Sequence, residues 1–99
     1  MNIVAVTACP TGIAHTYMAA EQLEKTAKTL GHAIRVETQG AMGIENELSA
    51  QDIHNADVAI FAVDIEVEKR ERFDGKRIVQ VTVQEAIRNP KGVLAKAGG

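Results

Sequence analysis

The sequence predicts an α/β domain with three αβα layers, in which a four-stranded parallel sheet of order 2-1-3-4 carries helices on both faces. Two short runs, 3–6 and 58–63, are almost wholly apolar, as expected of strands buried on both faces. Helical segments separate the strand candidates, and this alternation is typical of βαβ units with right-handed crossovers. A chain of 99 residues suits one such domain.

The first half of the chain contains two strand candidates around one long helix. After the run at 3–6, apolar residues recur at helical spacing over 15–30, and Gly31 is suited to end that helix. Apolar and polar side chains alternate over 34–38, which predicts a strand with one polar side at an edge of the sheet. A loop is expected at 39–43.

The second half supplies the other strands and the shorter helices. Ser49 and Asp52 have the spacing of a capping box, which predicts a short helix that ends near residue 55. The elements expected after it are a strand at 58–63, a helical turn or two at 66–73, a turn at 74–75, a strand at 77–81, and closing helices at 82–88 and after Pro90. We divide the chain into one domain over 1–95 and a flexible tail over 96–99.

Composition and charge exclude several classes of function. The net charge of −2 and the 3% of aromatic residues provide neither the basic excess nor the stacking surface that nucleic acids require. The single cysteine cannot form an internal disulfide, and no Cys/His cluster has zinc-ligand spacing, so neither a disulfide nor a zinc site is available to hold the fold together. We expect no metal or other cofactor. Without a basic leader or an apolar run of roughly 18 residues, we expect a cytoplasmic protein with no direct membrane insertion.

Cys9 ends the first strand and opens the loop that leads into the long helix. Backbone N–H groups at the start of that helix should point into one concavity, a geometry that binds anions and favours the thiolate form of the cysteine. The loop candidates are Pro10, Thr11, Gly12, Ile13, Ala14, His15 and Thr16. The alternative is that Cys9 is merely a small apolar residue at a strand end. Its position where the winding of the sheet reverses favours a functional thiol, because α/β folds bind their ligands there.

Position 15 distinguishes two chemistries. In small α/β tyrosine phosphatases the corresponding residue is an arginine, which grips phosphate with a bidentate fork. His15 supplies at most one donor to the phosphate, so stabilisation of the transition state for hydrolysis should be poor. A phosphocysteine formed here should persist until another acceptor arrives. Two roles remain open for His15, direct contact with phosphate or thiolate and orientation of the loop.

The segment 7–16, TACPTGIAHT, with 18–21 behind it, closely resembles enzyme IIB, the B component of fructose-type sugar phosphotransferase systems. Further segments that share this resemblance are 36–40, 43–48, 56–58, 72–73 and 75–76. The resemblance extends from about residue 2 to residue 95, and the cysteine loop contains no departure from the family's pattern.

This resemblance implies a protein-phosphocysteine–sugar phosphotransferase. Cys9 would attack the phosphohistidine of a IIA component, hold the phosphoryl group as a thiophosphate ester, and pass it to a fructose-like sugar on the membrane IIC component during uptake. The family's phosphorylated cysteine corresponds to Cys9, and residues 11–16 match the loop that holds the phosphoryl group. The protein would then work at the inner face of the membrane when it is associated with the permease.

Four residues outside the loop are candidates for an accessory role. Asp64 follows the third strand beside the same crevice, where it could repel the phosphoryl group, polarise His15, or simply be a solvated carboxylate. Glu37 and Gln39 end the second strand and either contact a partner or stabilise the following loop. Arg72 lies in a run of mixed charges, which is typical of a solvated face but could help to dock an acidic partner.

Two other functions are compatible with the same residues. A phosphatase or arsenate reductase of similar architecture would hydrolyse an aryl phosphate steadily, although the absence of arginine at position 15 disfavours this reading. A regulatory or scaffold domain would carry an unreactive thiol. A redox role has less support because the chain has no second cysteine.

Overall fold

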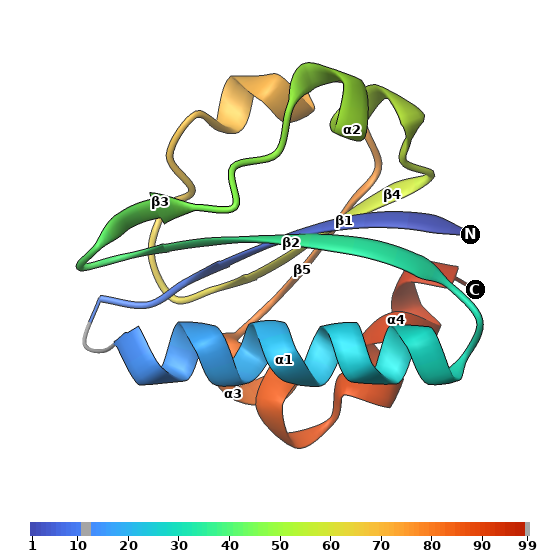
Figure 1. Ribbon diagram of the computed structural model, residues 1–99, viewed down its shortest axis with the longest axis horizontal. Coiled ribbons are helices and arrows are strands. Elements are labelled where there is room, and N and C mark those ends of the chain that lie inside the picture. Colours follow the sequence, from blue (N-terminus) through green and yellow to red (C-terminus); the bar gives the residue numbers. More distant parts are fainter. Residues whose placement is uncertain (11–12, 99) are drawn as a thin grey trace.

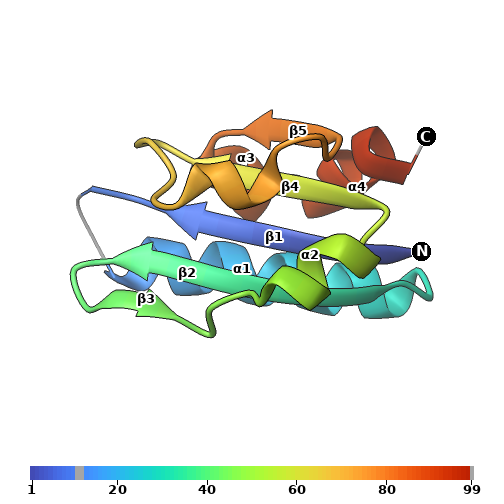
Figure 2. The same cartoon turned by 90° about the horizontal axis from the view of Figure 1, so that it is seen from above.

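The computed structural model describes residues 1–10 and 13–98, and in this part of the chain five strands form one mixed sheet. The strands are β1 (Asn2–Ala8), β2 (Ala33–Gly40), β3 (Gly43–Glu45), β4 (Val58–Val63) and β5 (Ile78–Val81). Their order across the sheet is β3-β2-β1-β4-β5, as Figure 2 shows from above. β1 pairs in parallel with β2 and β4, and β4 with β5, whereas β3 runs antiparallel to β2.

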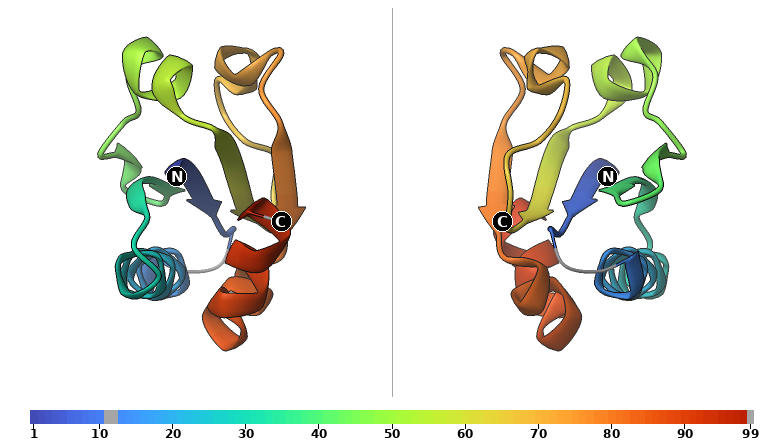
Figure 3. Two further views of the ribbon diagram at one scale, coloured as in Figure 1. Left: turned by 90° about the vertical axis from the view of Figure 1, so that its right-hand side faces the viewer. Right: turned by 90° about the vertical axis from the view of Figure 1, so that its left-hand side faces the viewer.

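Helices cover both faces of the sheet and give three layers (Figures 1 and 3). One face carries α1 (Ile13–Thr29), α3 (Val83–Arg88) and α4 (Pro90–Gly98). The other face carries α2 (Ala50–Asn55) and the 3₁₀ helix η1 (Arg70–Phe73). No helix in the described part of the chain combines the length and the apolar character that a membrane crossing requires.

An apolar core lies on each face of the sheet. The core under α1 includes Ile3 and Ala5 of β1 and Leu23 of α1, whereas the core under α2 and η1 includes Val4 of β1 and Phe61 of β4. Successive residues of β1 thus enter opposite cores, as the pleat of a strand requires. This burial on both sides explains why the central strands are continuous apolar runs in the sequence.

Local sequence signals set the ends of two helices. After α1, Gly31 adopts a φ of +82°, and the N–H groups of Gly31 and His32 donate to the carbonyls of Lys28 and Ala27, the pattern of a Schellman motif. At the start of α2, the side chains of Ser49 and Asp52 each accept a hydrogen bond from the other's backbone N–H at 3.0 Å. The predicted capping box is therefore confirmed.

The sheet differs from the predicted four parallel strands. The α/β class is confirmed, and β2, β1, β4 and β5 follow one another in that order, but the fifth strand β3 makes the sheet mixed. The segment expected to be a loop is a tight hairpin in which Gly40 pairs with Gly43. Gly43 has a φ of +85°, which a residue without Cβ adopts at little steric cost. The prediction that the second strand forms the edge is wrong here, because β3 pairs with its carboxyl end.

Two segments in the last third of the chain also differ from the predicted secondary structure. The charged helical stretch predicted at 66–73 is reduced to η1. Residues 96–98, predicted as part of a flexible tail, form the end of α4. Ala97 is 1% exposed, and its carbonyl accepts a hydrogen bond from Arg77 Nη1 at 2.6 Å. The burial of Ala97 and the hydrogen bond from Arg77 together account for the extension of α4 to Gly98.

Candidate active site

Cys9 lies immediately after β1, at the carboxyl end of the central strand. Its side chain is 6% exposed and belongs to the apolar cluster that includes Ala20 of α1 and Val83 of α3. Thr11, Gly12 and the side chain of Ile13 lie outside the described residues. The predicted ring of loop amides around the sulfur therefore stays a prediction, while the strand-end position of Cys9 is confirmed.

The remaining loop candidates divide by exposure. Pro10, Ala14 and His15 are exposed, whereas Thr16 is 1% exposed. Thr7, at the end of β1, is fully buried, and its Oγ1 donates a hydrogen bond to the Thr16 carbonyl at 3.1 Å. This bond ties the beginning of α1 to β1 across the Cys9 loop. Thr7 was not among the predicted site residues, although a hydroxyl inside a buried apolar strand is a signal that could have pointed to it.

Asp64 leaves the sheet beside Cys9. Ala8 and Val63 are register partners in the parallel strands β1 and β4, so the residues that follow them leave the sheet at the same end. The backbone N–H of Asp64 donates to the Ala8 carbonyl at 2.9 Å, and its Oδ1 accepts from the Val83 N–H at 3.3 Å. Asp64 is exposed, and these bonds favour the interpretation as a strand-end carboxylate that also holds the start of α3.

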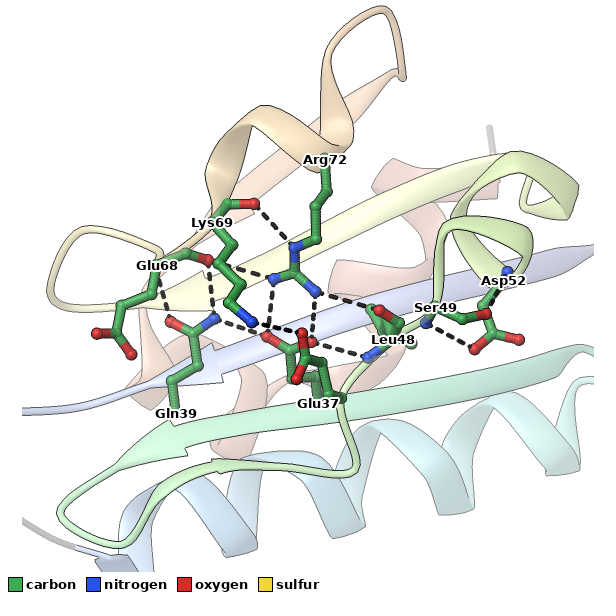
Figure 4. A network of polar contacts seen from close by, with 9 residues as sticks. Glu37, Gln39, Leu48, Ser49, Asp52, Glu68, Lys69 and Arg72 are labelled. Atoms are coloured by element: carbon green, nitrogen blue, oxygen red, sulfur yellow. Dashed lines mark hydrogen bonds and ion pairs between the residues drawn. The ribbon is translucent and has the colours of Figure 1, made fainter.

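The other three accessory candidates meet between the sheet and the layer of α2 and η1, as Figure 4 shows. Cys9 belongs to the apolar cluster on the other face, under α1. Glu37 of β2 is 0% exposed and binds Arg72 of η1 through two parallel hydrogen bonds of 2.8 and 3.0 Å. The Leu48 N–H donates to the same carboxylate at 2.9 Å, and Gln39 Nε2 donates to it at 2.6 Å. Such a buried, bidentate pair is a structural link between β2, the segment before α2, and η1.

Gln39 extends this network to the loop before η1. Its Oε1 accepts from the Glu68 N–H at 2.9 Å, and its Nε2 donates to the Glu68 carbonyl at 3.2 Å. Arg72 also donates from Nε to the Lys69 carbonyl at 2.8 Å. The geometry thus supports the loop-stabilising alternative for Glu37 and Gln39, and contact with a partner stays a prediction.

The network shifts the ionisation of both charged groups. Burial acts to raise the pKa of Glu37, but the bonds from Arg72, the Leu48 N–H and Gln39 outweigh it and bring that pKa below its ordinary value of 4.5. The same bond to Glu37 raises the pKa of Arg72. Both groups are therefore charged at neutral pH.

A second contact joins α1 to the hairpin beside the cysteine loop. The Tyr17 hydroxyl donates a hydrogen bond to Glu45 Oε1, and this bond to a carboxylate raises the pKa of Tyr17. Sequence reasoning missed this contact because β3 was not predicted. In the described part of the chain, no three His, Cys, Asp or Glu side chains are grouped so that they could hold a metal ion.

Comparison with known proteins identifies the family. The sequence model described as "PTS system, Lactose/Cellobiose specific IIB subunit" matches residues 4–96. This chain belongs to the PTS IIB family. The resemblance drawn from the cysteine loop and the later segments is thereby confirmed.

Individual relatives of this IIB protein are named for fructose rather than lactose or cellobiose. The fructose-like EIIB component 2 of Escherichia coli K12 is 51% identical over 95 residues, which cover 96% of this chain and 90% of that protein. The fructose-specific EIIABC component of Bacillus subtilis 168 is 55% identical over 96 residues, which cover 97% of this chain and 15% of the longer protein.

Solved structures agree with the fold. A domain of the fructose-specific IIABC component of Borrelia burgdorferi superposes with a TM-score of 0.91 at 51% identity, covering 95% of this chain and 89% of that one. The enzyme IIB subunit of the PTS from Escherichia coli K12 gives a TM-score of 0.90 at 43% identity, covering 96% and 88%.

Membership of this family fixes the general role of the IIB chain. IIB components are phosphotransferase domains of a sugar-uptake system. The EIIABC relative contains a segment like this chain within one longer protein, which indicates that IIB acts together with IIA and IIC components.

Proposed function

We propose that Cys9 accepts a phosphoryl group from the phosphohistidine of a IIA component and transfers it to a fructose-like sugar bound to a membrane IIC component. The position of Cys9 is the observation that carries this proposal: the chain's one cysteine follows the central strand, where β2 lies on one side and β4 on the other. Ligands of α/β sheets bind at this switch point. On this proposal the protein works in the cytoplasm, at the inner face of the membrane.

The proposed cycle has two displacements at phosphorus. In the first, the Cys9 thiolate attacks, an S–P bond forms, the P–N bond breaks, and the electron pair returns to the donor histidine. In the second, a sugar hydroxyl oxygen attacks, an O–P bond forms, the S–P bond breaks, and the electron pair returns to sulfur. The proton of that hydroxyl passes to a base at the sugar site. The protein's task is positioning and electrostatic stabilisation, as in phosphoryl transfer generally.

The beginning of α1 supports the charge requirements of this cycle. α1 starts at Ile13, shortly after Cys9, and is anchored by the bond from Thr7 to Thr16. A helix N-terminus stabilises an adjacent anion by about 0.3–1 kcal/mol, which favours both the thiolate and the phosphoryl group. We assign the phosphoryl-holding role to the loop 10–16, in which His15 contributes an exposed imidazole.

Exposed apolar side chains support the approach of protein partners at the end of the sheet where Cys9 lies. This end, formed by the carboxyl ends of the parallel strands and the segments that follow them, is called the Cys9 edge below. Met42 in the hairpin is 69% exposed, and Tyr17, Met18 and Ile65 are also exposed. They come from the start of α1, the β2–β3 hairpin and the segment after β4, all of which lie toward the carboxyl ends of the parallel strands. Tyr17 and Met42 line the same narrow cavity, and exposed apolar groups that lie together are typical of interaction surfaces.

Intact-mass analysis tests the proposal. Wild-type protein mixed with the phosphorylated IIA component should gain the ~80 Da of one phosphoryl group, and Cys9→Ser should gain nothing. Adding membranes that contain the IIC component should discharge the adduct only when fructose is present. A phosphorylated Cys9→Ser protein, or an adduct that persists with both membranes and sugar, contradicts the proposal. Steady hydrolysis of an aryl phosphate would favour the hydrolase instead.

A further inference from the structure

Two buried threonines lie side by side near the carboxyl ends of β1 and β2 and differ in their hydrogen bonding. Thr7 of β1 and Thr38 of β2 are register partners, with exposed fractions of 0% and 4%. Thr7 Oγ1 donates to the Thr16 carbonyl. Thr38 Oγ1 is buried and has no hydrogen-bond partner in the described part of the chain. Figure 2 shows the two strands adjacent along their length, with α1 running along them on one face of the sheet.

The fold alone gives no reason for a hydroxyl at Thr38. A buried hydroxyl without a partner is destabilising, whereas valine has nearly the same shape, favours strands, and carries no polar group to satisfy. The neighbouring residue on the same face of β2, Val36, is apolar and belongs to the core under α1. Departures from polar satisfaction of this kind concentrate at functional sites, where a group waits for a partner that another state supplies.

The position of Thr38 connects it to the cysteine loop. Its register partner Thr7 precedes Cys9 on the same face of β1. Thr38 also lines a narrow cavity together with Thr16 and Tyr17 of α1 and the β2–β3 hairpin, and this cavity has no room for a water molecule. Within the described part of the chain, a partner can therefore reach the Thr38 hydroxyl only if the beginning of α1 or the β2–β3 hairpin shifts.

Phosphorylation of Cys9 is an event that would cause such a shift. A phosphoryl group brings about 1.5 to 2 negative charges and three strong acceptor oxygens to the beginning of α1. Backbone groups and hydroxyls nearby then gain by reorienting toward it. A donor without a partner in the described part of the chain breaks no hydrogen bond there when it forms the new one, so the new bond, less the cost of the shift, favours the phosphorylated state.

We propose that Thr38 is a positioning residue of the phosphocysteine state, whose hydroxyl makes a hydrogen bond when Cys9 carries a phosphoryl group and makes none when the thiol is unmodified. This inference rests on the proposed function. Its energetic consequence is that Thr38 shifts the phosphoryl equilibrium between the IIA histidine and Cys9 toward Cys9.

The test is the equilibrium constant for phosphoryl exchange between the phosphorylated IIA component and this protein, read by intact mass. Thr38→Val should lower it by about tenfold or more, the effect of one hydrogen bond to a charged group. Thr38→Ser keeps the hydroxyl and should remain within about threefold of wild type, a rescue that a packing role would not produce. Denaturant unfolding of the unphosphorylated proteins completes the comparison. Thr38→Val should have a midpoint equal to or above that of wild type, whereas Thr7→Val should have a lower one.

Several results would overturn the inference. An unchanged equilibrium constant in Thr38→Val, or a loss in Thr38→Ser as large as in Thr38→Val, would do so. So would a clearly lower unfolding midpoint for Thr38→Val, because the hydroxyl would then have a partner in the unmodified protein. If wild-type protein is not labelled at Cys9 at all, the proposed function fails as well, which separates the two outcomes.

Discussion

The Arg72 guanidinium covers both oxygens of the Glu37 carboxylate, Nη1 to Oε1 at 2.8 Å and Nη2 to Oε2 at 3.0 Å. The carboxylate is fully buried and the Arg72 side chain is 16% exposed. The two residues are 35 positions apart in the sequence, so the pair closes a long segment of chain onto the sheet. It fixes η1 over the face opposite Cys9.

Removing Arg72 should therefore be costly. Arg72→Ala leaves a buried carboxylate without its counter-ion, and we expect the free energy of unfolding to fall by about 3–5 kcal/mol in a urea titration. Glu47→Gln is the matched control, because it breaks the exposed Lys69–Glu47 pair of 2.8 Å and should cost at most about 1 kcal/mol. Similar losses of unfolding free energy in the two variants would show that the buried pair contributes no more to stability than the exposed pair.

The same pair predicts a pH dependence of stability. The folded-state pKa of Glu37 is below its ordinary value of 4.5, so its contribution is complete above pH 4.5 and is lost as the pH falls through the folded pKa. Asp52 behaves in the same direction, because its bonds to Ser49 lower its pKa. Unfolding free energies measured from pH 7 to pH 3 should decline less steeply for Glu37→Gln than for wild type. Parallel profiles would contradict this.

Met42 provides a test of the partner surface. Met42→Glu places a charge on the most exposed of the large apolar side chains at the Cys9 edge, and it should slow phosphorylation by the IIA component about tenfold, as loss of an interface anchor does. Leu30→Glu is the control, because Leu30 is 44% exposed at the other end of α1. Both variants should keep wild-type unfolding midpoints. Equal slowing in both would argue against a surface centred on the Cys9 edge.

Sequence periodicity was sufficient for the elements that bury apolar residues. The strands around 3–6 and 58–63, the long helix, its Gly31 terminus and the Ser49–Asp52 capping box all follow from local patterns. β3 was missed because it has only three residues and depends on a hairpin whose pairing partner lies in β2. Local patterns also indicated neither the buried end of α4 nor the arginine that holds it.

The candidate site was predictable at Cys9 and less so around it. A lone cysteine at a strand end before a glycine-containing loop has a local signature, and the structure places it at the switch point. Glu37 and Gln39 were predicted either to contact a partner or to stabilise the following loop, but their partners Arg72, Leu48 and Glu68 come from distant segments that meet only after folding. The alternation of β2 suggested a solvated side, whereas the loop before η1 covers it.

His15 supplies the last prediction, because it occupies the position where small α/β tyrosine phosphatases have an arginine. His15 is exposed in the first turns of α1, so a longer side chain can be accommodated without repacking the core. An arginine fork would stabilise the charge that develops on phosphorus during attack by water, which a single imidazole donor does poorly. His15→Arg should therefore shorten the lifetime of the phosphocysteine severalfold, measured as decay of the mass adduct after removal of the IIA component. His15→Gln keeps a hydrogen-bond donor without an arginine fork and should leave that lifetime close to wild type. If the arginine variant holds its phosphoryl group as long as wild type, the persistence of the phosphocysteine does not depend on the residue at position 15, and the missing arginine does not explain why hydrolysis is slow.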